Sequence, residues 1–159
     1  MATVHLLHGL PGTGKTELAK KLAREQHALL LNHDLLMVER HGHNPPLRDF
    51  ARYATEISGE LWARTAQLVR EERNVILDWG FWTRASRDEA RARIAAAGGE
   101  CLLYRLVCPD AVARERTLQR GQSGGVGVLA INGAAWDSFL AKFEPLGDDE
   151  ERLDFVAMD

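Results

Sequence analysis

Residues 9–16 read G-L-P-G-T-G-K-T, and this stretch constrains the fold more than any other part of the chain. It matches the pattern G-x-x-x-x-G-K-[ST], which forms a loop around phosphate groups. Glycine lets the backbone curl until successive N–H groups point inward, and a helix that begins near Lys15 adds the positive end of its dipole. We expect the following residues to hold the phosphates of a nucleotide: Gly9, Leu10, Pro11, Gly12, Thr13, Gly14, Lys15 and Thr16. Lys15 would reach the β- and γ-phosphates and act in catalysis, and the Thr16 hydroxyl would bind Mg²⁺.

The sequence on both sides of this motif supports the interpretation. Residues 3–8 are a short β-rich run, and apolar residues repeat at three- and four-residue spacing over residues 15–26, which predicts a helix. A phosphate-binding loop needs this setting, between a strand and a helix. The alternative is a glycine-rich turn with an incidental lysine, and the flanking pattern makes it the weaker reading.

Strand-like and helix-like segments alternate along the rest of the chain. Further strands are predicted over residues 28–31, 74–77, 100–108 and 153–157. Helices are predicted from about residue 50 over some 25 residues, from 86 to 97, from 110 to about 120, and from 134 to 143. Ser86 and Glu89 form a capping box at the start of the second of these helices. This alternation predicts an α/β fold in which a parallel sheet carries helices on both faces.

Composition limits the classes of protein that remain. The chain has 159 residues, of which 45% are hydrophobic and 27% charged, and this predicts one domain over residues 1–159. A net charge of −3 makes nucleic acid an unlikely general partner, because a surface that coats nucleic acid needs a basic excess. Cys101 and Cys108 do not have zinc-ligand spacing. The sequence shows no signal-peptide pattern and no membrane-length apolar run, so we expect a cytoplasmic protein of undetermined oligomeric state.

Two aspartates follow predicted strands and are candidates for the chemistry. The carboxyl ends of parallel strands meet at one edge of the sheet, where ligands bind, so Asp34 and Asp78 should lie near the phosphate loop. Asp78 follows V-I-L and is predicted to bind Mg²⁺; Asp34 is predicted to bind the acceptor and to accept its proton as a general base. The assignment of the two roles stays open, and so do three alternatives: Asp34 could cap a helix, Asp78 could end a turn, and His33 could be the base.

Four arginines are candidates for anion binding. Arg116 and Arg120 share a helix face just before the glycine-rich residues 121–127. Near a short lid at about residues 121–131, this pair would stabilise transition-state charge and stack on adenine, so it is predicted to be both catalytic and nucleotide-binding. Arg84 and Arg87 follow Asp78 closely and are predicted to hold an acceptor or the transferred phosphate. The alternative for Arg116 and Arg120 is an exposed salt-bridging face, and the alternative for Arg84 and Arg87 is that they simply belong to a stretch rich in charge.

Three aromatic residues follow Asp78: Trp79, Phe81 and Trp82. At least one of them should anchor the core, because large aromatic side chains bury well. Trp79 and Trp82 are predicted to form an apolar wall for an acceptor.

Several motifs together resemble the small phosphate-loop kinases grouped with zeta toxins and chloramphenicol phosphotransferase, and in particular the bacterial AAA-domain kinases. The shared motifs are the phosphate loop, N-H-D at Asp34, D-W-G-F-W-x-R-x-x-R-D from Asp78, R-x-x-x-R at Arg116, and F-E-P at residues 143–145. The resemblance implies a three-layer α/β/α fold with about five parallel strands in the order 2-3-1-4-5. It also implies transfer of the γ-phosphate of ATP to a hydroxyl, with Asp34 at the position of the catalytic acid/base.

We therefore expect an ATP- and Mg²⁺-dependent kinase that acts on a small metabolite, antibiotic or nucleotide-like molecule. One alternative is a nucleotide-binding switch or slow ATPase that acts through a protein partner. Another is a polynucleotide 5′-kinase, against which the acidic net charge counts. ATP is favoured over GTP because the chain has no guanine-reading N-K-x-D string.

Overall fold

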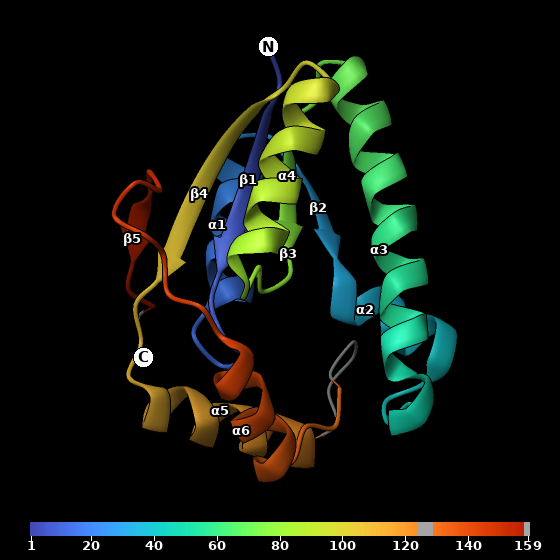
Figure 1. Ribbon diagram of the computed structural model, residues 1–159, viewed down its shortest axis with the longest axis vertical. Coiled ribbons are helices and arrows are strands. Elements are labelled where there is room, and N and C mark those ends of the chain that lie inside the picture. The colour runs from blue at the N-terminus through green and yellow to red at the C-terminus, as the bar shows by residue number, and fades with distance from the viewer. Residues whose placement is uncertain (124–128, 158–159) are drawn as a thin grey trace.

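Five parallel strands form the centre of the molecule in the order β2-β3-β1-β4-β5 (Figure 1). The computed structural model describes residues 1–123 and 129–157. The strands are β1 (Thr3–His8), β2 (Leu29–Asn32), β3 (Val75–Asp78), β4 (Glu100–Leu106) and β5 (Leu153–Phe155). The predicted number, direction and order of the strands are confirmed.

The central strands are apolar on both faces because helices cover both sides. Val4 of β1 is in register with Val75 of β3 and with Cys101 of β4. Val4 packs toward one layer of helices, while Leu7 packs toward the other. Strand side chains alternate between faces, so a strand buried on both sides appears in sequence as an almost continuous apolar run.

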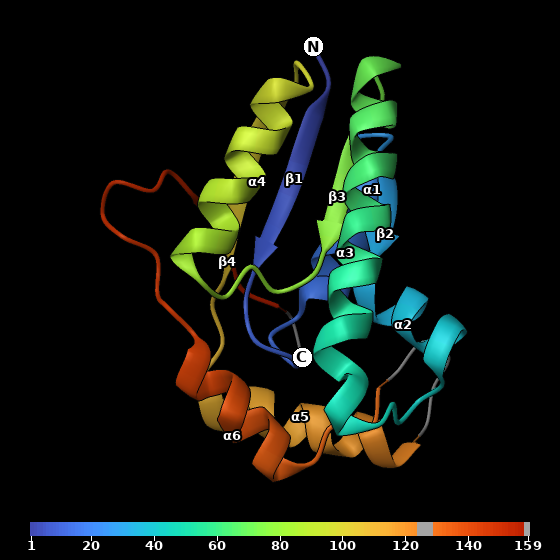
Figure 2. The ribbon, with the colours of Figure 1, turned by 45° about the vertical axis from the view of Figure 1, so that its right-hand side comes forward.

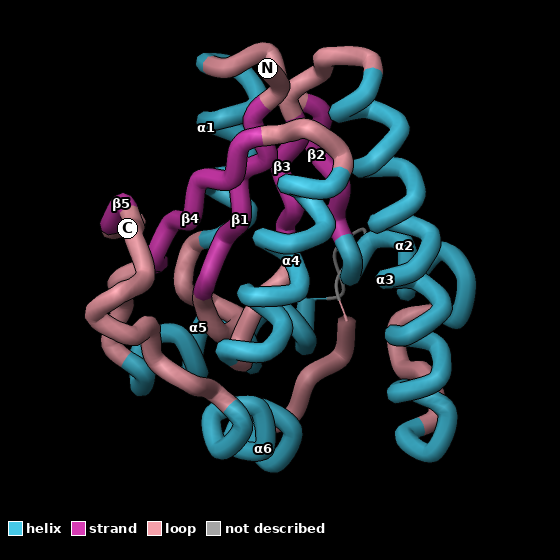
Figure 3. The backbone as a smooth tube through the Cα atoms, turned by 45° about the horizontal axis from the view of Figure 1, so that its top comes forward, coloured by secondary structure: helices cyan, strands magenta, loops and turns pink. Residues whose placement is uncertain are grey.

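The helices form the outer layers (Figure 2). Helix α1 (Lys15–Glu25) packs on one face of the sheet, and α3 (Leu47–Arg70) and α4 (Arg84–Ala96) pack on the other. Helices α2 (His33–His41), α5 (Asp110–Ser123) and α6 (Gly133–Lys142) lie beyond the carboxyl ends of the strands (Figures 1 and 3). The three-layer α/β/α prediction is confirmed, and α2, α5 and α6 are left to surround the edge where ligands bind.

Two helices differ from the sequence prediction. Helix α2 was not anticipated; its cap is Asn32, whose side chain accepts a hydrogen bond from Leu35 N at 2.9 Å. Helix α4 begins at Arg84 rather than at Ser86, because Thr83 Oγ1 accepts a hydrogen bond from Ser86 N at 3.1 Å. The predicted capping box is therefore wrong, and Glu89 pairs with Arg93 instead.

The predicted lid near residues 121–131 is only partly within the described ranges. Residues 124–128 lie outside them. On either side, Gly121 belongs to the last turn of α5, and Leu129 is buried against α2 and α3. Among the helices of the described residues, none is long and apolar enough to cross a membrane.

Candidate active site

The loop between β1 and α1 has the backbone that a phosphate-binding loop requires. Gly12 and Gly14 have φ angles of 87° and 102°, in the left-handed region that favours glycine. A Cβ atom on Gly12 would also lie 2.0 Å from the carbonyl oxygen of Ala113 in α5. Glycine is therefore needed at position 12 both for its conformation and for the close approach of α5.

Hydrogen bonds inside the loop leave its helix end open. The carbonyl oxygen of Leu10 accepts from Thr13 Oγ1 at 2.8 Å and from Lys15 Nζ at 3.1 Å. Helix α1 starts at Lys15 after Gly14, and within the described chain no side chain caps it. Its first N–H groups therefore remain available to a phosphate, together with the positive end of the helix dipole.

Two tryptophan side chains hold the outer side of the loop. Trp82 Nε1 donates to the carbonyl oxygen of Gly9 at 3.1 Å, and Trp136 Nε1 donates to that of Pro11 at 3.0 Å. Trp136 is in α6, 1% exposed, and was not singled out from the sequence. With these two carbonyl groups turned outward, the N–H groups of Leu10 and Gly12, which share their planar peptide units, point the opposite way.

The oxygens of Asp78 and Thr16 face each other across the mouth of the loop. Asp78 ends β3 and is 5% exposed; its Oδ2 accepts from Thr16 Oγ1 at 3.3 Å and from Asn32 Nδ2 at 3.0 Å. Burial raises the pKa of the Asp78 carboxyl, while nearby Lys15 opposes that shift. A cation would stabilise this buried carboxylate, and Mg²⁺ is held by one or two protein oxygens together with waters and phosphates. These residues therefore fit a magnesium ion.

Lys15 lies between the two aspartates. Burial lowers the pKa of its ammonium group, and the negative charges of Asp78 and Asp34 oppose the shift. The anionic phosphates of a nucleotide would favour the charged form of Lys15 in the same way.

An open crevice of about 1100 Å³ brings the predicted groups together at the carboxyl ends of the strands. The predicted residues that line it are Pro11, Gly12, Gly14, Lys15, Thr16, Asp34, Asp78, Trp79, Arg116 and Arg120. The loop residues Gly9, Leu10 and Thr13 are buried and do not line the crevice. Asp34 lies in the first turn of α2, where Asn32 is the cap, so the alternative that Asp34 caps this helix is wrong.

Helix α5 contributes both arginines of the pair. Arg116 and Arg120 line the crevice, and Arg116 Nη1 also lies 3.9 Å from Cys108 Sγ. The positive charge of Arg120 acts on both Lys15 and Asp78: it adds to the lowering of the Lys15 pKa by burial and opposes the raising of the Asp78 pKa by burial. Ten further lining residues were not among the predicted site residues: Glu17, Lys20, Leu30, Asn32, Leu35, Thr117, Gln119, Leu129, Ile131 and Ala157. Lys20 carried a sequence signal, since it lies one helical turn after Thr16.

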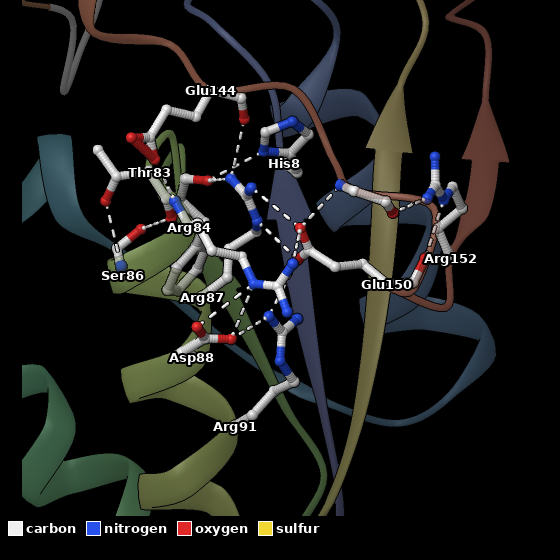
Figure 4. Close-up of polar contacts among 12 residues, drawn as sticks. His8, Thr83, Arg84, Ser86, Arg87, Asp88, Arg91, Glu144, Glu150 and Arg152 are labelled. Atoms are coloured by element: carbon white, nitrogen blue, oxygen red, sulfur yellow. Dashed lines mark hydrogen bonds and ion pairs between the residues drawn. The ribbon is translucent and has the colours of Figure 1, made fainter.

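The structure directs three other predicted residues away from the crevice. Trp82 packs against Phe139 of α6, with ring centroids 4.8 Å apart. Arg87 is fully buried and binds Glu150 through Nε at 2.8 Å and Nη2 at 3.1 Å, while its Nη1 donates to the carbonyl oxygen of Phe81 (Figure 4). Arg84 pairs with Asp149 at 2.8 Å. Their polar groups are occupied within the protein, so we correct the expectation that they hold an acceptor.

Arg84 and Arg87 belong to what we call the arginine cluster: Arg84, Arg87, Arg91, Asp88, Asp149 and Glu150. Figure 4 labels all of these residues except Asp149. The arginine cluster joins the start of α4 to the segment before β5. The motif from Asp78 to Asp88 is therefore divided: its first two residues line the crevice, and its arginines stabilise the fold.

His33 also lies outside the crevice lining. Its Nε2 is 3.3 Å from Ser58 Oγ of α3, and its ring meets Trp79 edge-on with centroids 5.7 Å apart. Burial lowers the pKa of the imidazole, and Asp34 opposes this. His33 therefore supports the ring of Trp79 from behind.

A phosphate loop between β1 and α1, an acidic residue at the end of the neighbouring strand and the order 2-3-1-4-5 define a phosphate-loop protein with a kinase fold. Residues 4–146 match the model of the AAA domain family, so the chain belongs to that family. The predicted likeness to small phosphate-loop kinases is confirmed at the level of fold. The narrower grouping with zeta toxins and chloramphenicol phosphotransferase stays a prediction.

Solved structures share this fold at low sequence identity. A candidate kinase from Chloroflexus aurantiacus has a TM-score of 0.78 and 19% identity, covering 96% of this chain and 86% of that one. A gluconokinase from Sinorhizobium meliloti has a TM-score of 0.66 and 15% identity, covering 99% and 84%. Kti12 from Chaetomium thermophilum, solved with ADP-AlF3, has a TM-score of 0.71 and 17% identity, covering 96% and 88%. No curated protein shows a significant match.

Proposed function

We propose that the protein is a kinase that transfers the γ-phosphate of ATP to a hydroxyl group of a small molecule. The observation that carries the proposal is that Asp34 lines the same crevice as the phosphate loop and the arginine pair. A protein that only binds a nucleotide needs the loop and a metal ligand, but it does not need a carboxylate on the acceptor side. The fold shared with kinases and with a protein holding ADP-AlF3 supports this reading.

The roles of the residues follow from their charges. Asp34 accepts the proton of the acceptor hydroxyl, and the hydroxyl oxygen of the acceptor attacks the γ-phosphorus of ATP. The bond between that phosphorus and the oxygen that bridges it to the β-phosphate breaks, and ADP leaves. Lys15, Arg116 and Arg120 offset the negative charge that spreads over the transferred group. Bound Mg²⁺, held by Thr16 and Asp78, would neutralise charge on the phosphate oxygens.

The proposal is tested with purified protein, Mg²⁺, ATP labelled on its γ-phosphate and a library of hydroxyl compounds. We expect label in one or more acceptors. Label found only as inorganic phosphate would favour a switch or slow ATPase, and label found only on oligonucleotide 5′-ends would favour a polynucleotide kinase.

Asp34→Asn tests the general base. Removing the proton acceptor should lower the rate of transfer about 10²–10⁴-fold while leaving ATP affinity nearly unchanged. Glu39→Gln is the matched control, because Glu39 is exposed on the same helix and does not line the crevice. Normal turnover by Asp34→Asn would place the base elsewhere.

A further inference from the structure

The crevice has one polar and one apolar side. Its cations come from the loop, α1 and α5, and they are Lys15, Lys20, Arg116 and Arg120. The other side is formed by Leu35 of α2, Trp79 after β3, and Leu129 and Ile131 before α6. Three of these apolar residues, Trp79, Leu129 and Ile131, belong to one hydrophobic cluster with Ile57 of α3. A nucleotide occupies the cationic side, so the apolar side is left to the acceptor.

The apolar side is held in place by contacts outside the crevice. The Trp79 ring stacks on Phe81 with centroids 5.0 Å apart and meets Trp62 edge-on at 5.5 Å. The segment before α6 is bonded to the loop that follows α2, because Ala130 N donates to the carbonyl oxygen of His43 at 2.9 Å. Leu35 nevertheless remains 37% exposed, facing the crevice. Such a surface favours a ligand with an apolar or aromatic face.

Charge on the acceptor side disfavours an anion. The crevice is lined by four cations and by the carboxylates of Glu17, Asp34 and Asp78. A magnesium nucleotide is itself an anion, so the loaded crevice holds more negative than positive charge. The arginines on the outer surfaces of α2 and α3 have partners of their own: Arg40 pairs with Glu60 at 2.6 Å and Arg52 with Asp49 at 3.2 Å. The charge of Lys15 interacts with Asp34, but the phosphates of the nucleotide also need Lys15, so an anionic acceptor beside Asp34 would compete with the nucleotide for this cation.

We propose that the acceptor is an uncharged alcohol with an aromatic or aliphatic face that packs against Trp79 and Leu35 while its hydroxyl meets Asp34. The inference rests on the proposed function, and it separates this site from one for sugar acids or phosphorylated nucleic-acid ends.

Matched pairs of probes test the charge of the acceptor. Thymidine is compared with thymidine 3′-monophosphate, phenyl β-glucoside with phenyl β-glucuronide, and octyl β-glucoside with octyl β-glucuronide. Affinity is measured by titration calorimetry on protein saturated with Mg²⁺ and a non-hydrolysable ATP analogue. We expect the uncharged member of at least one pair to bind about tenfold or more tightly than its anionic partner. The inference is overturned if no uncharged member binds more tightly, including the case in which neither member binds.

A charge placed on the apolar side provides the second test. Leu35→Lys should bring the affinity ratio of that pair close to one, because it adds a cation beside Asp34. Leu140→Lys is the control: Leu140 is also 37% exposed but lies on α6, outside the crevice lining. A ratio that Leu35→Lys leaves unchanged would contradict the inference.

Phosphorylation of the same probes is followed separately. If an uncharged probe binds preferentially but none of the probes is phosphorylated, the kinase proposal is refuted and the proposed class of ligand stands. Phosphorylation of anionic members alone would refute this inference and leave the kinase standing.

Discussion

The crevice and the arginine cluster are both rich in charge, yet the net pKa shifts of their buried groups have opposite effects on the charged forms. In the crevice, burial lowers the pKa of Lys15 and raises that of Asp78, so both shifts disfavour the charged forms. In the cluster, burial alone would raise the pKa of Glu150, but hydrogen bonds from Arg87, Gly147 N and Arg91 outweigh it and lower the pKa to about 2. Hydrogen bonds to Asp149 and Asp88 likewise raise the pKa of Arg84.

The difference separates charges that serve the fold from charges that serve a ligand. Ion pairs within the protein already stabilise the charged forms in the arginine cluster. In the crevice, the charged forms lack full compensation until phosphate and metal arrive. A pKa shift that disfavours the charged form of a residue in an open crevice is characteristic of functional sites. Removing a crevice charge should therefore change activity, and removing a cluster charge should change stability.

Lys15→Met should have the largest effect. It removes the cation nearest the transferred phosphate and should lower the rate of transfer about 10²–10³-fold, measured with labelled ATP. The free energy of unfolding, measured with urea, should stay the same or rise, because a partly desolvated cation is lost. A large loss of stability without loss of activity would break the comparison.

Arg87→Met should mainly change stability. It leaves Glu150 buried without its closest partner, so the free energy of unfolding should fall by about 3–5 kcal/mol. Arg87→Met with Glu150→Gln should recover part of this loss, because the unpaired charge is then absent. If the double variant is as unstable as the sum of the two single variants, the pair is not coupled.

Lowering the pH should weaken the arginine cluster only below about pH 4.5. Because the folded pKa of Glu150 is below its usual 4.5, its contribution to stability is complete above about pH 4.5 and is lost as the pH falls toward 2. The difference in unfolding free energy between the wild type and Glu150→Gln should shrink over that range. A difference that stays constant from pH 6 to pH 2 would contradict the lowered pKa.

Trp136→Phe should have the smallest effect. It removes one hydrogen bond to the loop, so the affinity for ATP should fall about fivefold, corresponding to about 1 kcal/mol. Trp62→Phe is the control, because Trp62 is also buried but belongs to α3 and packs in the core cluster on that face of the sheet. If both variants bind ATP as the wild type does, Trp136 has no part in positioning the loop.

Much of the fold could be predicted from local pattern. The loop motif, the apolar strands and the helical repeats led to the correct sheet, because each depends on residues close together in sequence. Helix α2 was missed because it is short and its cap, Asn32, also holds Asp78 from another strand. The start of α4 was placed two residues late because both Thr83 and Ser86 can cap a helix.

The candidate site could be predicted only in part. Asp34 and Asp78 were placed by a topological rule, and Arg116 and Arg120 by their shared helix face before the glycine-rich residues; all four line the crevice. The sequence could not show that Arg84 and Arg87 stabilise the fold rather than bind a ligand, because their partners Asp149 and Glu150 lie more than sixty residues away. Trp136 had no local signal, since its role depends on the packing of α6 under the loop.

By itself, the sequence determined a phosphate loop, a parallel sheet and the acidic residues at its carboxyl edge, because local backbone preferences and strand–helix alternation suffice for these. Only the tertiary structure decided which charges are paired. A salt bridge such as Arg87 to Glu150 forms between segments that meet only after the chain has folded. The same folding leaves Lys15, Asp34 and Asp78 facing an open crevice, where a ligand can complete them.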